Sequence, residues 1–138
     1  MANTSLNDSD NSDMVLADFP QHLYMLASAA TDEHRLHFVV QVLDEVAKLF
    51  QEDHSSAAWG EVTVDHFLHS VTQQANGLRS CYQHLNRKNR RLHMYFKTLA
   101  FDLQQMEYSA EAWEMVRAAV KLHLFRAQLL VQPPMAGQ

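Results

Sequence analysis

Residues 32–50 read DEHRLHFVVQVLDEVAKLF, and this stretch decides the class of fold. Its apolar residues return after three or four positions, which is the period of an α-helix with one side in a core. That stripe consists of Leu36, Val39, Val40, Leu43, Val46, Ala47 and Phe50. Phe38, Val42 and Leu49 lie outside the stripe, so we expect neighbours on more than one side of this helix.

The flanking sequence predicts four further helices by the same periodicity. We expect a short helix at about residues 18–29 and longer ones at about residues 61–83, 92–106 and 110–132. Asp18 and Ser109 are the expected N-caps of the first and last of these, and Pro133 stops the last one. The predicted fold class is therefore all-α, with four long helices and one short helix.

The composition fits one domain of this kind. The chain has 138 residues, of which 47% are hydrophobic and 20% are charged, as in ordinary globular proteins. Its three glycines and three prolines are too few for a turn-rich β-sandwich or barrel. No apolar run approaches the ~20 residues of a membrane-spanning helix, so we expect no membrane partner. We assign residues 1–17 to an acidic, disordered tail, residues 18–132 to the bundle and residues 133–138 to a C-terminal tail.

The last predicted helix is apolar on nearly all sides. One side carries Trp113, Val116, Val120, Leu124, Ala127 and Leu130, and another carries Met115, Leu122 and Leu129. We therefore expect this helix at the centre of the bundle, with Trp113 in the core. Gly77, inside the third predicted helix, costs about 1 kcal/mol relative to alanine, and we expect it to mark close packing or a bend.

The net charge of −5 is unevenly divided along the chain. Residues 1–78 carry twelve carboxylates and two basic side chains, whereas residues 79–138 carry nine basic side chains and four carboxylates. Such a division can steer a charged partner, or the two halves can simply attract each other within one fold. The basic run at residues 87–91 has the composition of a nucleic-acid patch. Because it lies in a predicted loop without interleaved aromatic residues, we expect no nucleic-acid partner.

No residue pattern indicates catalysis or a metal centre. His34 and His37, and likewise His66 and His69, stand three residues apart and share a helix face, as metal ligands can. No acidic residue is followed by histidine three positions later, which a di-metal carboxylate bundle requires, so we interpret the histidines as surface or partly packed residues. Cys81, the one cysteine, lies on the apolar face of a predicted helix, where a thiol is inert. We expect no enzyme, cofactor or metal.

Residues 107–117 read EYSAEAWEMVR. This segment resembles the C-terminal signature of the teleost type I interferons, which are class II helical cytokines. Supporting similarities are FPQHLY at residues 19–24, TVDHFL at 63–68, Leu78-x-x-Cys81, and HMYFK at 93–97. They follow one another in the order expected for that family.

The resemblance implies an interferon-like helical cytokine bundle of the up-up-down-down type and a secreted antiviral protein without catalytic residues. Members of that family bind two different class II cytokine receptor chains and induce JAK-STAT signalling, so we expect the same partners here. On this resemblance the last helix supplies the receptor contacts, with Glu114, Arg117 and Lys121 as the binding residues. The alternative for Arg117 is an ion pair with Glu114 or Glu111 in the same helix.

Two departures from that family concern the N-terminal part of the chain. Members of the family begin with a signal peptide and a long first helix, and we identify neither here, so we expect an N-terminally truncated or replaced form. The two-cysteine members join an N-terminal cysteine to the position of Cys81, and that partner is missing. A missing first helix would leave an apolar groove on the last helix, which a second copy of the chain can fill as a homodimer.

The missing signal peptide keeps a second interpretation open. In this alternative the chain is an intracellular, signal-peptide-less isoform, a regulatory or protein-binding helical protein without direct extracellular receptor signalling. The signature at residues 107–117 favours the cytokine, and the missing leader favours the alternative.

Overall fold

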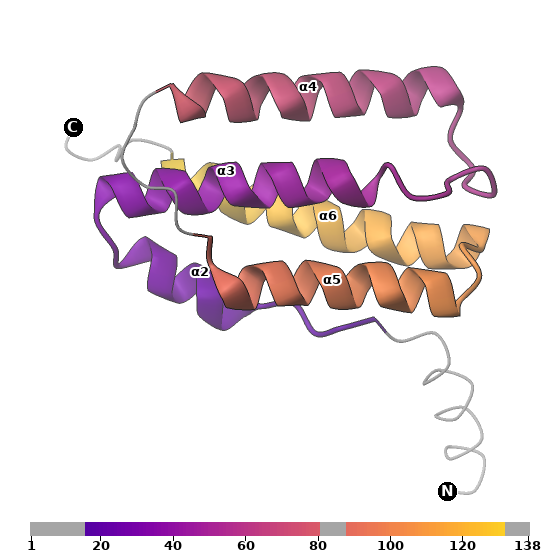
Figure 1. The fold of residues 1–138 in the computed structure, drawn as a ribbon, viewed down its shortest axis with the longest axis horizontal. Coiled ribbons are helices and arrows are strands. Elements are labelled where there is room, and N and C mark those ends of the chain that lie inside the picture. Colours follow the sequence, from indigo (N-terminus) through magenta and orange to yellow (C-terminus); the bar gives the residue numbers. More distant parts are fainter. Residues whose placement is uncertain (1–15, 81–87, 132–138) are drawn as a thin grey trace, which may run out of the picture.

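The structure is a computed structural model that describes residues 16–80 and 88–131. These residues form five α-helices and no strand, so the predicted all-α class is confirmed. The helices are α2 (Gln21–Ser28), α3 (Asp32–Leu49), α4 (Glu61–Arg79), α5 (Arg90–Gln105) and α6 (Ala110–Val131). The four long helices lie nearly side by side in a bundle, and the short α2 lies beside the first half of α3 (Figure 1).

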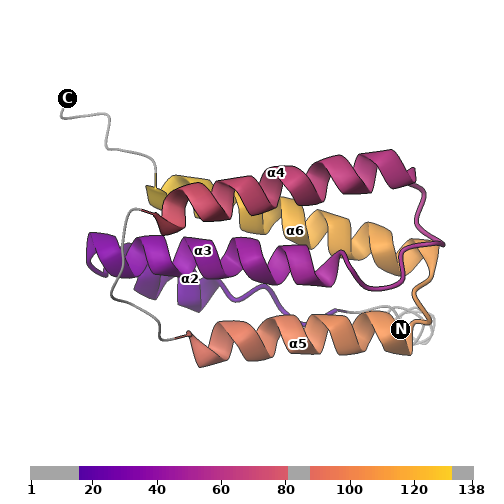
Figure 2. The same cartoon turned by 45° about the horizontal axis from the view of Figure 1, so that its top comes forward.

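The helix at the centre of the bundle is α3. It contacts each of the other four helices. In both ribbon views α4 lies on one side of α3 and α5 on the other, and α6 runs along a third side (Figures 1 and 2). Val42 and Val46 retain no exposed surface, which confirms that this helix is covered on more than one side.

The last helix is not at the centre, and the prediction that it would be was wrong. α6 packs on α2, α3 and α5, but its Leu122, Phe125 and Leu129 remain 42–57% exposed. Apolar atoms make up much of any protein surface, so an apolar side of a helix does not by itself require a protein neighbour. The all-round apolar pattern of residues 110–132 therefore overstated how much of this helix is buried.

The first helix begins later than predicted. The prediction of Asp18 as the N-cap was wrong: Pro20 occupies that position, and α2 starts at Gln21. The preceding segment instead reaches α5, where the backbone N–H of Ala17 donates to Asp102 Oδ2 at 3.0 Å. This hydrogen bond ties the segment before α2 to α5.

Two other helix ends differ from the predicted ones. α5 begins at Arg90, two residues before the predicted start, because the Asn89 side chain caps it by accepting from the N–H of Leu92 at 2.9 Å. α4 ends at Arg79, four residues short of the predicted end. Cys81 and the disulfide question attached to it lie outside the described residues.

An aromatic cluster closes one end of the bundle around Trp113. This side chain is fully buried, with ring centroids of Phe50 and Trp59 at 5.4 and 5.5 Å. Its indole N–H donates to the backbone carbonyl of Asp53 at 2.9 Å, so the loop between α3 and α4 is fastened to α6. The prediction that Trp113 belongs to the core is confirmed.

A buried imidazole joins three helices at the other side of α6. His123 has no exposed surface; its Nδ1 lies 2.7 Å from the hydroxyl oxygen of Tyr24 and its Nε2 lies 2.9 Å from that of Tyr95. A neutral ring satisfies both contacts, because one nitrogen donates and the other accepts. Burial lowers the pKa of His123 to about 3, so the ring stays neutral. The interpretation of the histidines as surface or partly packed residues was wrong for this one.

The buried imidazole predicts that acid weakens the fold. The unfolded chain binds a proton at His123 near pH 6.5, whereas the folded chain resists it down to about pH 3. Stability is therefore fully present above pH 6.5 and falls as the pH drops towards 3, by about 2 kcal/mol at pH 5 from this group alone. Urea unfolding of the wild type and of His123→Gln at pH 7 and pH 5 measures this. The variant should lose about 2 kcal/mol less on acidification, and identical pH dependence would contradict the assignment.

Gly77 is not a close-packing position, so that part of the expectation was wrong. A Cβ added there would meet no atom within 4 Å, and the residue lies inside α4. Its glycine therefore costs helix stability without a steric reason.

Gly77→Ala should consequently stabilise the protein by about 0.5–1 kcal/mol, measured by thermal or urea unfolding. The matched control is Gly60→Ala, which also meets open space but replaces the N-cap residue of α4. Alanine is a poor N-cap, so this control should give no gain. A destabilised Gly77→Ala would show that α4 approaches another part of the chain at that point.

Candidate functional site

The predicted binding residues Glu114, Arg117 and Lys121 all lie on one side of α6. The helix places them there because positions three and four apart share a face. Ser109 caps the helix as predicted, since its hydroxyl accepts from the N–H of Ala112 at 3.1 Å. The structure therefore brings the three residues together on a rigid element.

Arg117 is partly engaged within its own helix. Its Nη1 lies 3.6 Å from Glu114 Oε1, and both side chains are about half exposed. This is one of the two ion pairs considered as the alternative for Arg117. An exposed pair at this spacing contributes only ~0.3–0.5 kcal/mol, so either partner can leave it for another contact at little cost. Lys121 makes no ion pair with any described residue.

An apolar groove runs beside these residues, between α4 and α6. Its first part is lined by Phe50, Trp59, Thr63, Val64, Phe67, Arg117, Val120, Lys121 and Leu124. It continues along α3 over Val39, Leu43, Val71, Gln74, Leu78, Ala127, Gln128 and Val131. Phe67 and Leu124 line both parts, so the two parts are adjacent, and Arg117 and Lys121 line the first. From the sequence we expected an apolar groove on the last helix.

The other flank of the binding residues is an exposed apolar stripe. Leu122, Phe125 and Leu129 recur at helix spacing on the outward side of α6, immediately after Lys121. From the sequence we expected Leu122 and Leu129 on a second apolar side of the helix, covered by the bundle. Phe125 was not included in that prediction. The signal available in the sequence was the excess of apolar residues over what one buried face needs.

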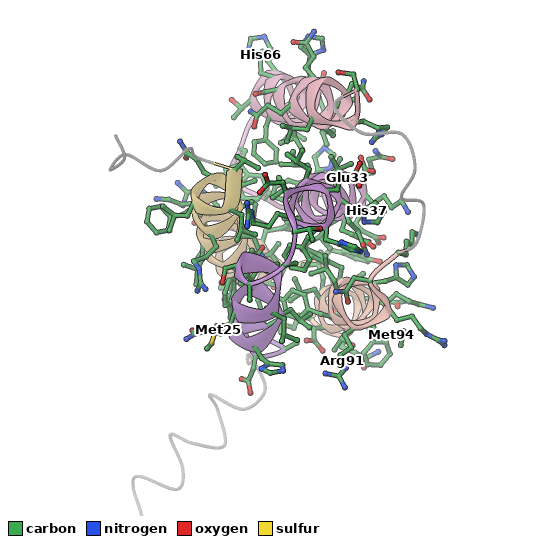
Figure 3. The ribbon with its side chains drawn as sticks, turned by 90° about the vertical axis from the view of Figure 1, so that its left-hand side faces the viewer. Met25, Glu33, His37, His66, Arg91 and Met94 are labelled. Atoms are coloured by element: carbon green, nitrogen blue, oxygen red, sulfur yellow. The ribbon has the colours of Figure 1, made fainter. Side chains whose placement is uncertain are left out.

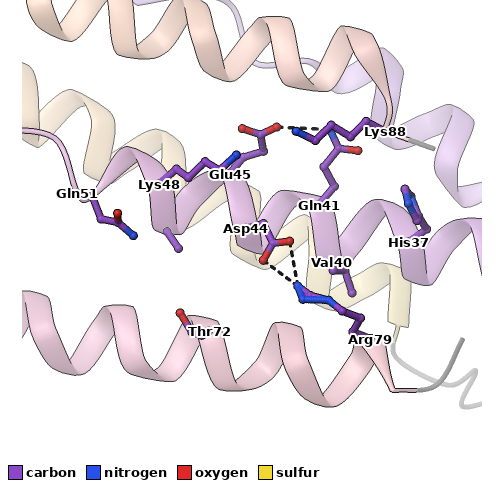
Figure 4. A pocket seen from close by; sticks show the side chains of 11 residues that line it. His37, Val40, Gln41, Asp44, Glu45, Lys48, Gln51, Thr72, Arg79 and Lys88 are labelled. Atoms are coloured by element: carbon purple, nitrogen blue, oxygen red, sulfur yellow. Dashed lines mark hydrogen bonds and ion pairs between the residues drawn. The ribbon is translucent and has the colours of Figure 1, made fainter. Parts of the chain in front are cut away.

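A second cleft, between α3, α4 and the start of α5, is polar (Figure 4). Asp44 accepts two bonds of 3.0 Å from Arg79 across the cleft, one at each carboxylate oxygen. Gln41 exchanges two hydrogen bonds with the backbone of Asn89, at 2.8 and 3.0 Å. These groups form hydrogen bonds with one another. The cleft therefore holds α3 to α4 and to the residue before α5 by polar contacts.

The other candidates from the sequence are the two histidine pairs, each of which shares one helix face. His34 contacts the Thr31 hydroxyl at 2.8 Å, while His66 and His69 are exposed on α4. Within residues 16–80 and 88–131, no group of three or more histidine, cysteine or acidic side chains is placed to hold a metal. No helix in that part of the chain is long and apolar enough to cross a membrane.

Comparisons with known proteins agree on one family. Residues 2–133 match the family model described as "Interferon alpha/beta domain". Interferon a3 of Oncorhynchus mykiss is 35% identical over 113 residues, covering 81% of this chain and 65% of the relative. Interferon alpha-1 of Equus caballus is 32% identical over 92 residues, covering 59% of this chain and 50% of the relative.

A solved structure agrees with this. Zebrafish interferon 1 superposes with a TM-score of 0.76 and 32% identity, covering 83% of this chain and 79% of that one. The chain spans between half and about two thirds of the length of the curated relatives named above.

Proposed function

This chain belongs to the interferon alpha/beta family, and we propose that it acts as a type I interferon-like cytokine that binds two different class II cytokine receptor chains and induces antiviral JAK-STAT signalling. The family consists of secreted antiviral cytokines that bind class II cytokine receptors and are not enzymes. The fold is the helical cytokine bundle of its structural relative. The alternative of an intracellular regulatory protein gains no support from the relatives, all of which are interferons.

The observation that carries the proposal is the exposed face of α6. Lys121, a cation without an ion pair among the described residues, stands beside the exposed apolar side chains of Leu122 and Phe125. Binding sites between proteins combine apolar anchors with charged groups around them. Glu114 and Arg117 continue the charged edge, and their weak mutual pair leaves the guanidinium available for a receptor carboxylate. We assign the first receptor contact to Glu114, Arg117 and Lys121 on this basis.

Replacing the two cations should weaken receptor binding without changing the fold. Arg117→Ala with Lys121→Ala should raise the Kd for a purified receptor ectodomain about tenfold or more, because a few residues, arginine prominent among them, carry most of the binding energy of an interface. Helicity and Tm should stay near those of the wild type, since both side chains are exposed and their losses are small. The conservative control Lys121→Arg keeps the charge and should retain binding. A folded double variant with unchanged affinity would remove this site while leaving the family assignment intact.

We also propose that a second copy of the chain covers the groove between α4 and α6. Support comes from the mainly apolar lining of its first part and from Phe67 and Leu124, which remain only partly buried. Contiguous apolar surface of this kind marks a site of association.

The homodimer predicts concentration-dependent association measured by sedimentation. Leu124→Gln, inside the groove, should shift the protein towards monomer, whereas Leu122→Gln on the outward side should leave the equilibrium unchanged. The wild-type monomer should also bind a hydrophobic dye such as ANS more strongly than the dimer does. A wild type that stays monomeric at all concentrations and binds no dye would mean that neighbouring side chains already close the groove.

A further inference from the structure

The outward face of α5 carries cations and apolar side chains along one line. The helix turns Leu92, Tyr95, Phe96, Leu99 and Leu103 towards the bundle. On the opposite side Arg90, Met94, Lys97 and Phe101 follow one another at steps of four, three and four, which places them in a single row. Met94 and Phe101 are 52% and 56% exposed, and both cations are exposed. We call these four residues the α5 row.

The cations of this face have no ion-pair partner among residues 16–80 and 88–131. Arg90, Lys97 and the neighbouring Arg91 make no ion pair or hydrogen bond through their side chains within the described part of the chain. Figure 3 shows Arg91 and Met94 pointing away from the bundle. By contrast, Arg79 is held by both carboxylate oxygens of Asp44 at 3.0 Å. The positive charge of α5 is therefore available to a partner.

Three carboxylates on or beside α5 make contacts of their own. Glu45 is almost fully buried and lies 2.9 Å from His93, and Glu52 accepts from the Tyr108 hydroxyl at 3.1 Å. Asp102 accepts the backbone N–H that precedes α2. None of these carboxylates forms an ion pair with Arg90 or Lys97.

Helix stability does not explain the arrangement. α3, α4 and α6 each begin with at least one acidic residue in the first turn, whereas α5 begins with Arg90 and Arg91 and has none there. Cations near the positive end of the helix dipole destabilise it. Arg90 and Arg91 thus go against the preference for acidic residues in the first turn of a helix. Such a departure from a local preference is expected where a surface serves a function.

We propose that the α5 row, with Arg91 beside it, binds a sulfated polysaccharide chain. Sulfate groups can meet Arg90 and Lys97, while Met94 and Phe101 offer apolar surface to the C–H faces of the sugar rings between them. A linear polyanion can contact one helix alone. A flat anionic membrane would also approach other parts of the protein, whose net charge of −5 would repel it. Single-stranded nucleic acid is bound by successive aromatic rings, and the row has one, Phe101. A secreted family meets such polysaccharides outside the cell.

The test compares two double variants that change the net charge equally. Arg90→Gln with Lys97→Gln removes the cations of the row, and Arg117→Gln with Lys121→Gln removes two exposed cations from α6. The ligand is a heparin oligosaccharide of defined length, and Kd is measured by surface plasmon resonance over a range of salt concentrations. Fully desulfated heparin, phosphatidylserine vesicles and a single-stranded oligonucleotide serve as competing probes. Circular dichroism checks that each variant is folded.

We expect the α5 double variant to raise the Kd for heparin about tenfold or more near 0.15 M salt. The slope of log Kd against log salt should fall by about two, one for each lost contact. The α6 double variant should keep the wild-type affinity and slope. Equal losses in both variants, equal binding of desulfated heparin, or no wild-type binding would overturn the proposal. Tighter binding of vesicles or oligonucleotide than of heparin would also overturn it and assign the face to that partner.

Discussion

The whole structure depends on the burial of the apolar residues of α3 by its four neighbouring helices. A helix whose apolar residues extend around most of its circumference cannot be stable in water, because each large side chain left exposed forfeits ~1.5–3 kcal/mol. α2, α4, α5 and α6 are arranged around it so that Val42 and Val46 retain no exposed surface. Each of these four helices turns one side towards α3. The side of α6 that carries Leu122, Phe125 and Leu129 faces away from α3 and remains exposed.

Polar contacts then set how the neighbours are oriented. Apolar burial alone is non-directional, but a polar group placed in a core must meet its partner or lose ~1–3 kcal/mol. Gln41 and Glu45, both almost fully buried on α3, are matched by the backbone of Asn89 and by His93 at the start of α5. His123 on α6 likewise contacts the hydroxyl groups of Tyr24 on α2 and Tyr95 on α5. These contacts define one register for each helix against the next.

Periodicity was enough to predict the five helices, the all-α class and the core position of Trp113, because those depend on local spacing. It could not show which helix lies at the centre, since an apolar side of α6 and an apolar side of α3 look alike until their neighbours are known. The burial of His123 was equally hidden, because its two tyrosine partners come from helices far away in the sequence. For the candidate site, the spacing of Glu114 and Arg117 correctly indicated a possible pair. The exposure of Phe125 could not be derived from sequence.

The aromatic cluster around Trp113 has a consequence for how the molecule is observed in solution. The chain has two tryptophans, and Trp59 and Trp113 lie in edge-to-face contact in the same cluster. Tryptophan emission therefore reports on the end of the bundle where the loop after α3 meets α6, and carries no direct signal from α2. An optical unfolding curve that precedes or follows the loss of helicity would reveal a bundle whose two ends separate in different steps.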